Sequence, residues 1–492
     1  MIIYNYVIII TMNSNNEIKQ IISRMNIIDN SILYPYQKKH AKLITYSLLT
    51  YGRALDTSDT GTGKTYCSLY TAKQLNLRPF VIAPKNALYN WRRSIKKIEL
   101  ESYGVVNYEL LKLGKYPVFI PDKNKYVNRI CPYVNVTKIP EERREKYDPK
   151  EHIEWYIKPD MLIIFDECHR CKNHKTGNFN LLTSIPKDAF VIMLSATIGE
   201  NSLKLMGVAK VLKLYDNNWE MYDWCSLYGA KKVNINRDRK VWVDRSIPSD
   251  ILRLHNDIGL RMHGIRTELL VKKNLFPETK IIAEPITLNE DETDEINNQY
   301  ESIYKKLDVL EYARQKFIVK EQHLQILQKE LQRIELQKVS TIVDMTMDFI
   351  EEGFSVVIFV NYTDTLLELL GELNTHCCIY GENDSKLNEA NRLMFEDNKS
   401  RIIVCNIASA QESIDLHDKY HKFKRISLIS PNFSAQTLKQ VLGRIHRAGS
   451  TNSVQYILFA SGTPEENIAK VVKKRISNID ILNDGEIPDD LF

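Results

Sequence analysis

The sequence lacks the features of a secreted, membrane-bound or disulfide-rich protein. Its eight cysteines are scattered over 492 residues, and no spacing among them resembles a disulfide framework, which favours a reducing compartment. No apolar run approaches the length of a membrane span, and the apolar start of the chain lacks the basic residues of a signal peptide. We therefore expect a soluble intracellular protein that begins with a short extension, whose true start is Met1 or Met12.

An excess of charge of one sign is also missing. The chain has 67 Lys and Arg against 62 Asp and Glu, a net charge of +5. This balance allows a local nucleic-acid-binding face but does not require one. With 43% hydrophobic residues, a chain of 492 residues is long enough for two to four domains with a core each.

One glycine-containing stretch fits a phosphate-binding loop. It consists of Ser58, Asp59, Thr60, Gly61, Thr62, Gly63, Lys64 and Thr65. Its glycines let backbone N–H groups face a phosphate, and a helix expected from about Tyr66 points its positive end at the same charge. Lys64 is predicted to reach the β- and γ-phosphates and Thr65 to hold Mg²⁺. The loop pattern usually begins with glycine where this chain has Ser58, and a glycine-rich turn before an amphipathic helix is the alternative.

An acidic pair follows a buried strand predicted at Met161–Phe165. Asp166 and Glu167 then lie at the carboxyl edge of a sheet, where the loop also lies. Asp166 is predicted to bind Mg²⁺, and Glu167 to orient or deprotonate the attacking water. An acidic helix N-cap is the alternative. Cys168 and Cys171 form a C-x-x-C, but no second Cys/His pair follows at zinc spacing.

The surroundings of this site predict an α/β domain. Pro35 suits the start of a helix, with Gln37 placed where its amide could read adenine. Trp91 is predicted to be a core or docking aromatic, and Ser195–Thr197 to couple the nucleotide site to a second surface by hydrogen bonds. Residues 115–160 are predicted to be a surface insertion with a solvated helix face at Glu141–Lys146. Further buried strands or strand-to-helix corners are predicted at Pro79–Pro84, Val105–Leu111 and Ala189–Leu194.

The second half predicts another doubly wound parallel sheet, because apolar strands alternate there with helices. The residues from Glu290 to Lys338 are strongly helical, with a leucine-rich stripe that favours a short helical hairpin or protrusion. The strands are predicted at Ser355–Val360, Cys377–Gly381, Arg401–Cys405 and Arg425–Ser430.

Gln440, Gly443, Arg444 and Arg447 form the pattern Q-x-x-G-R-x-x-R. On a helix the two arginines share a face. With no acidic neighbour to pair with, they suit a triphosphate, because guanidinium groups bind phosphate in a fork geometry. A structural pair of arginines is the alternative.

These segments resemble superfamily 2 helicases, and more narrowly the Swi/Snf-type double-stranded DNA translocases. The motifs are Tyr34–Gln37, Asp59–Thr65, Ala83–Lys85 with Asn90–Trp91, Asn107–Glu109, Asp166–Asn173, Met262–Arg266 with Leu275–Lys280, Asn361–Thr363 with Tyr380–Gly381, Gln440–Gly449 and Gly462–Glu466. The resemblance implies two RecA-like lobes with ATP between them and Arg444 and Arg447 as arginine fingers. It also implies roles in catalysis for Gln440 and His169. The chain departs from the family at Ile407–Asp418, where the family usually has glycines before an apolar Leu, and Gln411 and Glu412 facing DNA would weaken phosphate contacts.

We therefore expect an α/β protein of two RecA-like doubly wound parallel-sheet lobes with a helical connector or protrusion. Its expected parts are an extension (1–30), lobe 1 (31–233), a connector (234–340), lobe 2 (341–475) and a tail (476–492). It is predicted to be a nucleic-acid-dependent ATPase, using ATP and Mg²⁺ to move along double-stranded DNA. A strand-separating DNA or RNA helicase and a non-catalytic scaffold with a relic nucleotide site are the alternatives. A large DNA virus or an intracellular microbe would suit the composition, and a viral protein would act in the host cytoplasm or virion.

Overall fold

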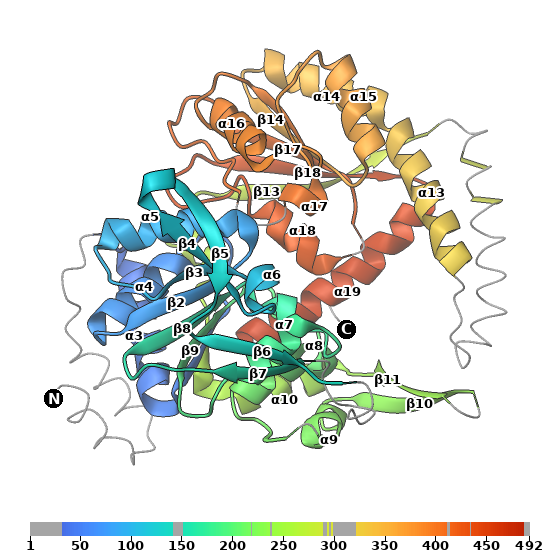
Figure 1. Cartoon of the computed structure of the whole chain (residues 1–492). Coiled ribbons are helices and arrows are strands. Elements are labelled where there is room, and N and C mark those ends of the chain that lie inside the picture. Colours follow the sequence, from blue (N-terminus) through green and yellow to red (C-terminus); the bar gives the residue numbers. More distant parts are fainter. Residues whose placement is uncertain are drawn as a thin grey trace. The chain divides into compact units, whose positions relative to one another are not determined.

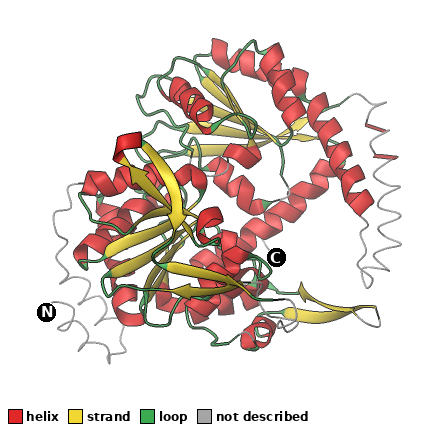
Figure 2. Cartoon of the chain, in the orientation of Figure 1, coloured by secondary structure: helices red, strands yellow, loops and turns green. Residues whose placement is uncertain are grey.

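The protein is described by a computed structural model (Figure 1). The described residues are 32–140, 151–217, 219–236, 239–288, 293–294, 297–298, 321–410, 414–432 and 434–486. Contacts divide the chain into two compact units. The first consists of Met1–Ala230, Asp244–Arg266 and Asn478–Phe492, and the second of Lys231–Val243 and Thr267–Ser477. Each unit is built around one parallel sheet flanked by helices (Figure 2), so the predicted fold class is confirmed.

The first unit holds a six-stranded sheet in the order β12-β1-β9-β8-β2-β3, with every pair parallel. Most of its strands are buried on both faces, which explains their continuous apolar runs. The four strands predicted from these runs, β2, β3, β8 and β9, are confirmed, whereas β1 and β12 were not predicted. The strands of this sheet are β1 (Arg53–Asp56), β2 (Arg78–Ala83), β3 (Gly104–Asn107), β8 (Met161–Asp166), β9 (Phe190–Leu194) and β12 (Met262–His263).

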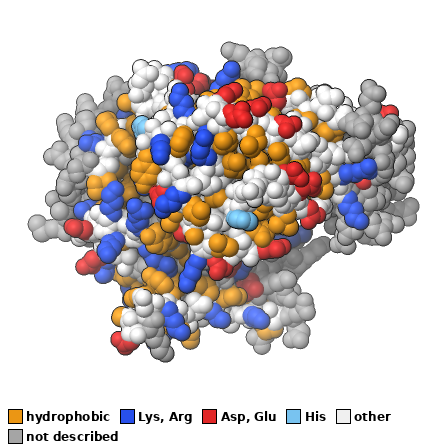
Figure 3. Space-filling view, turned by 90° about the horizontal axis from the view of Figure 1, so that it is seen from above, with side chains coloured by type: hydrophobic (Ala, Val, Ile, Leu, Met, Phe, Trp, Pro, Cys, Tyr) orange, Lys and Arg blue, Asp and Glu red, His pale blue; other side chains and the backbone are white. Residues whose placement is uncertain are grey.

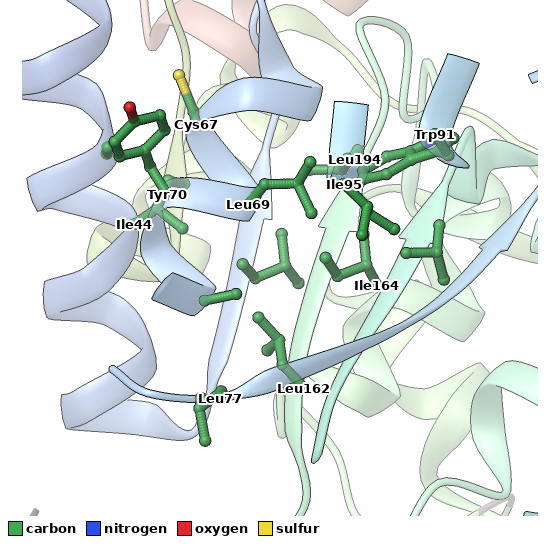
Figure 4. Packing of buried hydrophobic residues seen from close by; sticks show 14 of the residues in the cluster. Ile44, Cys67, Leu69, Tyr70, Leu77, Trp91, Ile95, Leu162, Ile164 and Leu194 are labelled. Carbon is green, nitrogen blue, oxygen red and sulfur yellow. The ribbon is translucent and has the colours of Figure 1, made fainter. Parts of the chain in front are cut away.

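The core of this unit lies between one face of the sheet and three helices. Along β8, alternate residues Leu162 and Ile164 join the cluster shown in Figure 4, because successive side chains of a strand point to opposite faces. Trp91 belongs to the same cluster and is 1% exposed, so the predicted core aromatic is confirmed. The helices are α3 (Pro35–Tyr51), α4 (Lys64–Gln74) and α5 (Leu88–Ile98).

The strand register aligns the carboxyl ends that carry the candidate site. Leu194 of β9 is paired with Asp56 of β1 on one side and with Asp166 of β8 on the other. Adjacent strands lie about 4.8 Å apart, so the two aspartates stand about 10 Å apart along one edge of the sheet. The loop after β1 and the acidic pair after β8 therefore share that edge.

The insertion predicted at 115–160 is built from two antiparallel hairpins. β4 (Lys115–Ile120) pairs with β5 (Lys125–Ile130), and β6 (Val134–Lys138) pairs with β7 (Glu151–Trp155). The sequence predicted no strands here, since scattered aromatics among Lys, Pro and Asn hide the alternation. The charged run Glu141–Lys146 lies outside the described residues.

Shorter elements complete the first unit, and the strands β10 and β11, which pair with each other, belong almost entirely to the second unit. All these elements are η1 (Lys85–Ala87), α6 (Tyr108–Leu111), η2 (Pro121–Lys123), η4 (Cys168–Cys171), α7 (Gly177–Thr183), α8 (Ser202–Val211), α9 (Glu220–Ser226), β10 (Ala230–Asn236), β11 (Arg239–Asp244), α10 (Pro248–Ile258) and η5 (Gly259–Arg261). The helix α6 begins directly after β3, and its N-cap Asn107 accepts a hydrogen bond from the N–H of Leu110 at 2.8 Å.

The second unit holds another six-stranded parallel sheet, in the order β13-β18-β17-β14-β16-β15. The four predicted strands are confirmed, whereas β13 and β18 were missed. The strands are β13 (Thr279–Ile286), β14 (Ser355–Val360), β15 (Cys378–Ile379), β16 (Ile402–Asn406), β17 (Arg425–Ile429) and β18 (Ser453–Ala460), and the helices are α11 (Thr267–Val271), α13 (Glu321–Gln337), α14 (Val339–Glu351), α15 (Thr363–Glu372), α16 (Ser385–Glu396), α17 (Ile407–Ala410) and α18 (Ala435–Leu442).

The structure changes two of the expected boundaries. The connector predicted at 234–340 is not wholly helical, because it contributes β12 to the first sheet and β13 to the second. The tail predicted at 476–492 begins inside the long helix α19 (Pro464–Asp484), whose residues from Asn478 onward belong to the first unit. Both differences arise because edge strands and the docking of a helix end depend on distant partners.

The predicted apolar stripe of the helical segment is present in α13, where Ile334 is fully buried in the core of the second unit. Much of the proposed protrusion lies outside the described residues, and so does the predicted extension 1–30. Across the part of the chain that the structure describes, no helix is long and apolar enough to cross a membrane.

Candidate nucleotide site

The predicted phosphate-binding loop joins β1 to α4 with two left-handed glycines. Gly61 has φ 83° and Gly63 has φ 97°. A Cβ on Gly63 would collide with Nε2 of Gln37, so both the backbone conformation and the space require glycine there. The helix begins at Lys64, close to the predicted start, and has 11 residues. The loop therefore has the shape that presents backbone N–H groups and a positive helix end to an anion.

Gln37 holds this loop from the start of α3. Its side chain donates a hydrogen bond from Nε2 to the carbonyl of Thr62 at 2.8 Å and accepts one at Oε1 from the N–H of Tyr34 at 2.9 Å. The side chain is buried, and both of its ends contact the backbone. Its predicted reading of adenine stays a prediction, whereas its contact with the loop is a structural finding.

Lys64 lies over the loop backbone. Its Nζ donates hydrogen bonds to the carbonyl oxygens of Ser58 at 2.7 Å and Asp59 at 3.3 Å. Thr62 closes the turn, because its Oγ1 donates to the Asp59 carbonyl at 2.8 Å. The ammonium group is therefore held at the centre of the loop, where phosphate oxygens can replace the carbonyls as its partners.

The structure explains why serine stands at position 58. Its Oγ accepts a hydrogen bond from the N–H of Ile265 at 2.9 Å and lies 3.1 Å from Nε2 of His40, in fully buried surroundings. Its N–H donates to Oδ1 of Asp56 at 2.9 Å. Burial raises the pKa of Asp56, but attraction to His40 and hydrogen bonds from His40 and Ser58 prevail and lower it to about 2. Glycine would leave these buried groups without a hydroxyl partner.

Arg266 is a loop-supporting residue that the sequence reading assigned only to a connector. It donates from Nη1 to the carbonyl of Thr57 at 2.6 Å and from Nη2 to the carbonyl of Asn483 at 2.9 Å, and it pairs through Nε with Asp484. Asn483 also donates to the carbonyl of Ala196 at 3.2 Å. The end of α19 is thus fastened to the loop and to the segment after β9. In the sequence, the Met262–Arg266 motif was the signal that could have indicated the role of Arg266.

Asp166 lies at the end of β8, as predicted, and is held by two aromatic residues. Trp91 donates from Nε1 to Oδ2 of Asp166 at 2.7 Å, and the Tyr108 hydroxyl donates to the Asp166 backbone carbonyl at 2.7 Å. Trp91 and Tyr108 come from separate motifs, and each is nearly inaccessible to solvent. The sequence placed Trp91 in the core but did not reveal that its N–H fixes the carboxylate.

Glu167 and His169 connect this carboxyl end with β9. Glu167 has φ 52°, a left-handed conformation that is rare and costly for a residue with a Cβ and that concentrates at functional sites. Nδ1 of His169 lies 3.2 Å from Oε2 of Glu167 and 3.0 Å from Oγ of Ser195. His169 therefore lies between the acidic pair and Ser195, while the predicted coupling of Ser195–Thr197 to a second surface stays a prediction.

Two expectations about the arginines of the second unit are wrong. The helix α18 ends at Leu442 with Gly443 as its C-cap, so Arg444 and Arg447 do not share a helix face. Arg447 is not without an acidic neighbour either, because its Nη2 lies 2.8 Å from Oδ1 of Asp415. The first expectation failed because Gly443 ends the helix before Arg444. The second failed because Asp415, in the segment Ile407–Asp418 that departs from the family, pairs with Arg447.

Arg444 is part of the interior of the second unit. It is 1% exposed and donates to the carbonyls of Gln440 at 2.9 Å and Ile414 at 2.9 Å. Its own carbonyl accepts from the N–H of Leu416 at 3.0 Å. Gln440 is also buried. Arg444 thus ties the end of α18 to residues 414–416, while Gln411 and Glu412 lie outside the described residues.

Two further motifs of the second unit anchor the end of α13 and its junction with α14. Glu335 of α13 accepts hydrogen bonds from the N–H groups of Asn361 and Tyr362, each at 3.0 Å. One turn later, Nζ of Lys338 donates to both carboxylate oxygens of Glu465, at 2.9 and 3.0 Å. Glu335, Lys338 and Glu465 are all nearly or fully buried. The residues Asn361–Thr363 and Gly462–Glu466 therefore have a structural role in this unit.

The first unit brings together donors that fit a Mg²⁺-bound triphosphate. The Thr65 hydroxyl at the helix start and the Asp166 carboxylate supply hard oxygen ligands, which Mg²⁺ prefers. Lys64 and the glycine loop supply cationic and N–H partners for phosphate oxygens. These donors come from one edge of one sheet, whereas the arginines belong to the second unit.

Comparisons with known proteins show which families the chain resembles. The family model for the res subunit of type III restriction enzymes matches residues 30–200, and that for the helicase conserved C-terminal domain matches residues 337–449. A protein of Acanthamoeba polyphaga mimivirus, provisionally named an ATP-dependent RNA helicase, is 31% identical over 474 residues, which cover 92% of this chain and 84% of the relative. The solved SWI2/SNF2 ATPase core of Sulfolobus solfataricus in complex with dsDNA shares 18% identity and a TM-score of 0.35, covering 94% of this chain and 96% of that one.

The two helicase family matches fall on the two parallel-sheet units, and the viral relative extends over almost the whole chain. The chain is thus a nucleic-acid-dependent ATPase that acts as an ATP-dependent motor, and it belongs to the superfamily 2 helicases.

Proposed function

We propose that this motor is of the Swi/Snf type and moves along double-stranded DNA while it hydrolyses ATP to ADP and phosphate. What supports the proposal is the convergence of three motifs on one aspartate, Asp166. Asp166 of the D-E-C-H-R-C-K-N stretch receives hydrogen bonds from Trp91 and Tyr108, which belong to two further motifs of the Swi/Snf pattern.

The first unit binds and positions the nucleotide. Lys64 and the loop from Ser58 to Gly63 hold the phosphates, and Thr65 and Asp166 hold Mg²⁺, which neutralises phosphate charge when bound. Glu167 orients the attacking water and accepts its proton. His169 couples Glu167 to Ser195, because its Nδ1 lies 3.2 Å from Oε2 of Glu167 and 3.0 Å from Oγ of Ser195.

The second unit supplies the arginine finger. Arg447 stabilises the charge that develops on the γ-phosphoryl group, an effect that commonly contributes about 10³ to 10⁵ in rate. Arg444 and Gln440 act as positioning residues, because both are buried and Arg444 spans α18 and residues 414–416. Closure and opening of the two lobes during the ATP cycle would shift their grip on DNA and produce steps.

The grip on DNA is expected to be mainly phosphate contact. Such contacts carry no sequence information and weaken with salt, because binding releases counterions from the duplex. Duplexes of any sequence should thus stimulate the ATPase activity of the chain, and should do so less as the salt concentration rises.

A strand-separating helicase on the same fold is the second candidate, and the name of the mimivirus relative favours RNA as its substrate. The virus that carries this relative also supports a viral origin for this chain, with the host cytoplasm or virion as its place of action. The scaffold alternative loses one of its two supports, because Ser58 has a structural role in the loop.

ATPase rates measured side by side with duplex DNA, single-stranded DNA and RNA test the proposal. We expect the largest stimulation with duplex DNA, displacement of a third strand from a triplex, and no separation of the two strands of a plain duplex. Stimulation by RNA alone, or efficient strand separation, would instead support the second candidate. Lys64→Ala and Glu167→Gln should both abolish hydrolysis, with Glu167→Gln still binding ATP, and full turnover in either would refute the site.

A further inference from the structure

The β4–β5 hairpin presents aromatic and apolar side chains to solvent. Phe119 is 45% exposed, Tyr126 is 48% exposed and Ile130 is 88% exposed. Phe119 and Tyr126 are directly paired across the hairpin, and their ring centroids lie 5.2 Å apart. Exposed rings that share one side of a hairpin form a platform on which a flat ligand can stack.

Basic residues accompany these rings. Between Lys115 and Ile130 the sequence has Lys115, Lys123, Lys125 and Arg129 against a single acid, Asp122. Across the described part of the chain, no acidic partner lies within ion-pair distance of Lys115, Lys125 or Arg129. Figure 3 shows Lys and Arg side chains dispersed among hydrophobic ones on the face in view, so a nucleic-acid contact has to be sought in local clusters such as this one.

The hairpin is linked to Asp166 through α5. The guanidinium group of Arg92 lies over the Tyr126 ring, 4.1 Å from its centroid, and donates to the Val105 carbonyl of β3 at 3.3 Å. The preceding residue, Trp91, donates to the Asp166 carboxylate. A displacement of Tyr126 would therefore act on the helix turn that fixes the Mg²⁺-binding carboxylate.

A second link runs through the base of the hairpin. The helix α6 precedes β4, and its first residue, Tyr108, donates to the Asp166 carbonyl at 2.7 Å. Tyr116 of β4 donates to the Tyr103 carbonyl at 2.8 Å, which fixes the hairpin on the sheet. The hairpin is thus joined to the same aspartate along two routes of short contacts.

We propose that the side of the β4–β5 hairpin formed by Phe119 and Tyr126, which Lys115 shares because it lies four residues before Phe119 along β4, is a nucleic-acid contact that reports its occupancy to Asp166 through Arg92 and Trp91. Phosphates pair with the basic side chains, and an exposed base or sugar face packs on the rings. A protein partner would also cover apolar side chains, but the excess of three basic residues favours a polyanion. The inference rests on the proposed function and names one of its binding surfaces.

The test uses the full chain with a double variant, Phe119→Ala with Tyr126→Ala. We expect its affinity for labelled duplex DNA, single-stranded DNA or RNA, measured by fluorescence anisotropy, to fall about tenfold or more. The ratio of ATPase rates with and without nucleic acid should fall in parallel. The matched control is Trp219→Ala, which removes an aromatic that is 74% exposed elsewhere in the chain and should leave both quantities unchanged. A comparison of the affinities for duplex DNA, single-stranded DNA and RNA shows which of these nucleic acids the hairpin contacts.

Two further variants separate binding from coupling. Lys115→Gln keeps the rings and should flatten the dependence of affinity on salt, by a slope of about 0.9 for each duplex phosphate that is no longer neutralised. Arg92→Gln should leave nucleic-acid affinity close to that of the wild type but reduce the stimulated rate. Loss of affinity in Arg92→Gln that matches its loss of stimulation would contradict the coupling route.

Different results would overturn the hairpin contact and the proposed function. If the wild type shows no stimulation by any nucleic acid, the proposed function is refuted. If the wild type is stimulated, but the double aromatic variant binds and responds like Trp219→Ala, the hairpin is not a contact. If that variant instead loses self-association or binding to a protein while nucleic-acid affinity is kept, the hairpin is a protein interface and the inference is also overturned.

Discussion

Arg447 is paired with Asp415, with 2.8 Å between Nη2 and Oδ1. The loss of hydration raises the pKa of Asp415, but attraction to Arg447 prevails, so that pKa lies below its usual range. The pair joins the arginine pattern of the second unit to the segment that departs most from the family. The finger proposed here is thus oriented by an aspartate of its own unit.

Arg447→Ala is expected to lower the nucleic-acid-stimulated kcat by about 10³ or more, because an arginine finger acts on transition-state charge. ATP affinity should change far less. Steady-state ATPase kinetics and binding of a fluorescent ATP analogue measure the two effects. Arg447→Lys should rescue little, since lysine lacks the planar fork of donors. A rate like that of the wild type in either variant would remove the finger role.

Trp91→Phe is expected to weaken the hold on Asp166 while keeping most of the core packing. The variant loses the N–H that donates to Oδ2 at 2.7 Å. A hydrogen bond to a charged group is worth about 1.5 to 3 kcal/mol, so the Mg²⁺ concentration for half-maximal ATPase should rise about tenfold or more. A Mg²⁺ titration at saturating ATP measures this shift. Leu88→Ile is a suitable control in the same helix, because it alters packing without touching the carboxylate.

Ser58→Gly restores the usual first residue of the loop and yet should destabilise the first unit. It removes the hydroxyl that accepts from Ile265 and contacts His40 in buried surroundings. Leaving such buried polar groups without a partner costs about 1 to 3 kcal/mol, which urea unfolding would detect. Ser68→Gly, which removes a serine hydroxyl from within α4, is the comparison for the general cost of glycine. Unchanged stability in Ser58→Gly would show that the hydroxyl is dispensable.

The stability of the first unit should depend on pH through His263. Burial lowers the pKa of His263 from 6.5 to about 4, against attraction to Asp56, and its Nε2 lies 2.7 Å from Oγ of Ser47. The unfolded chain then binds more protons than the folded chain between pH 6.5 and 4, so the free energy of unfolding falls as the pH falls through that window. At one pKa unit per 1.36 kcal/mol, the full loss amounts to about 3 kcal/mol.

Melting temperatures recorded between neutral pH and pH 4 would reveal this loss. His263→Gln should flatten the dependence, because an amide does not titrate there. The pKa of Asp56, lowered to about 2, lies beneath this window, so its own contribution would be lost only at still lower pH. An equal slope in the wild type and in His263→Gln would assign the dependence to other groups.

The buried strands could be predicted from sequence because they are continuous apolar runs. Met161–Phe165 and Ser355–Val360 need no partner information to be recognised, since burial on both faces leaves no polar alternation. The edge strand β13 has an irregular burial pattern and was missed. The hairpins of the insertion were missed because scattered aromatics among Lys, Pro and Asn hide their alternation.

For the site, the sequence alone determined the chemistry: a glycine loop with Lys64 and Thr65, an acidic pair after a strand, and an arginine pattern in the second half. Those residue types and spacings are local, so the chain order reveals them. Only the tertiary structure decided which residues hold the site in place. Trp91 on Asp166, Arg266 beneath the loop, Ser58 against Ile265 and Asp415 beside Arg447 are contacts between distant segments. They depend on strand register and helix ends, which no local pattern specifies.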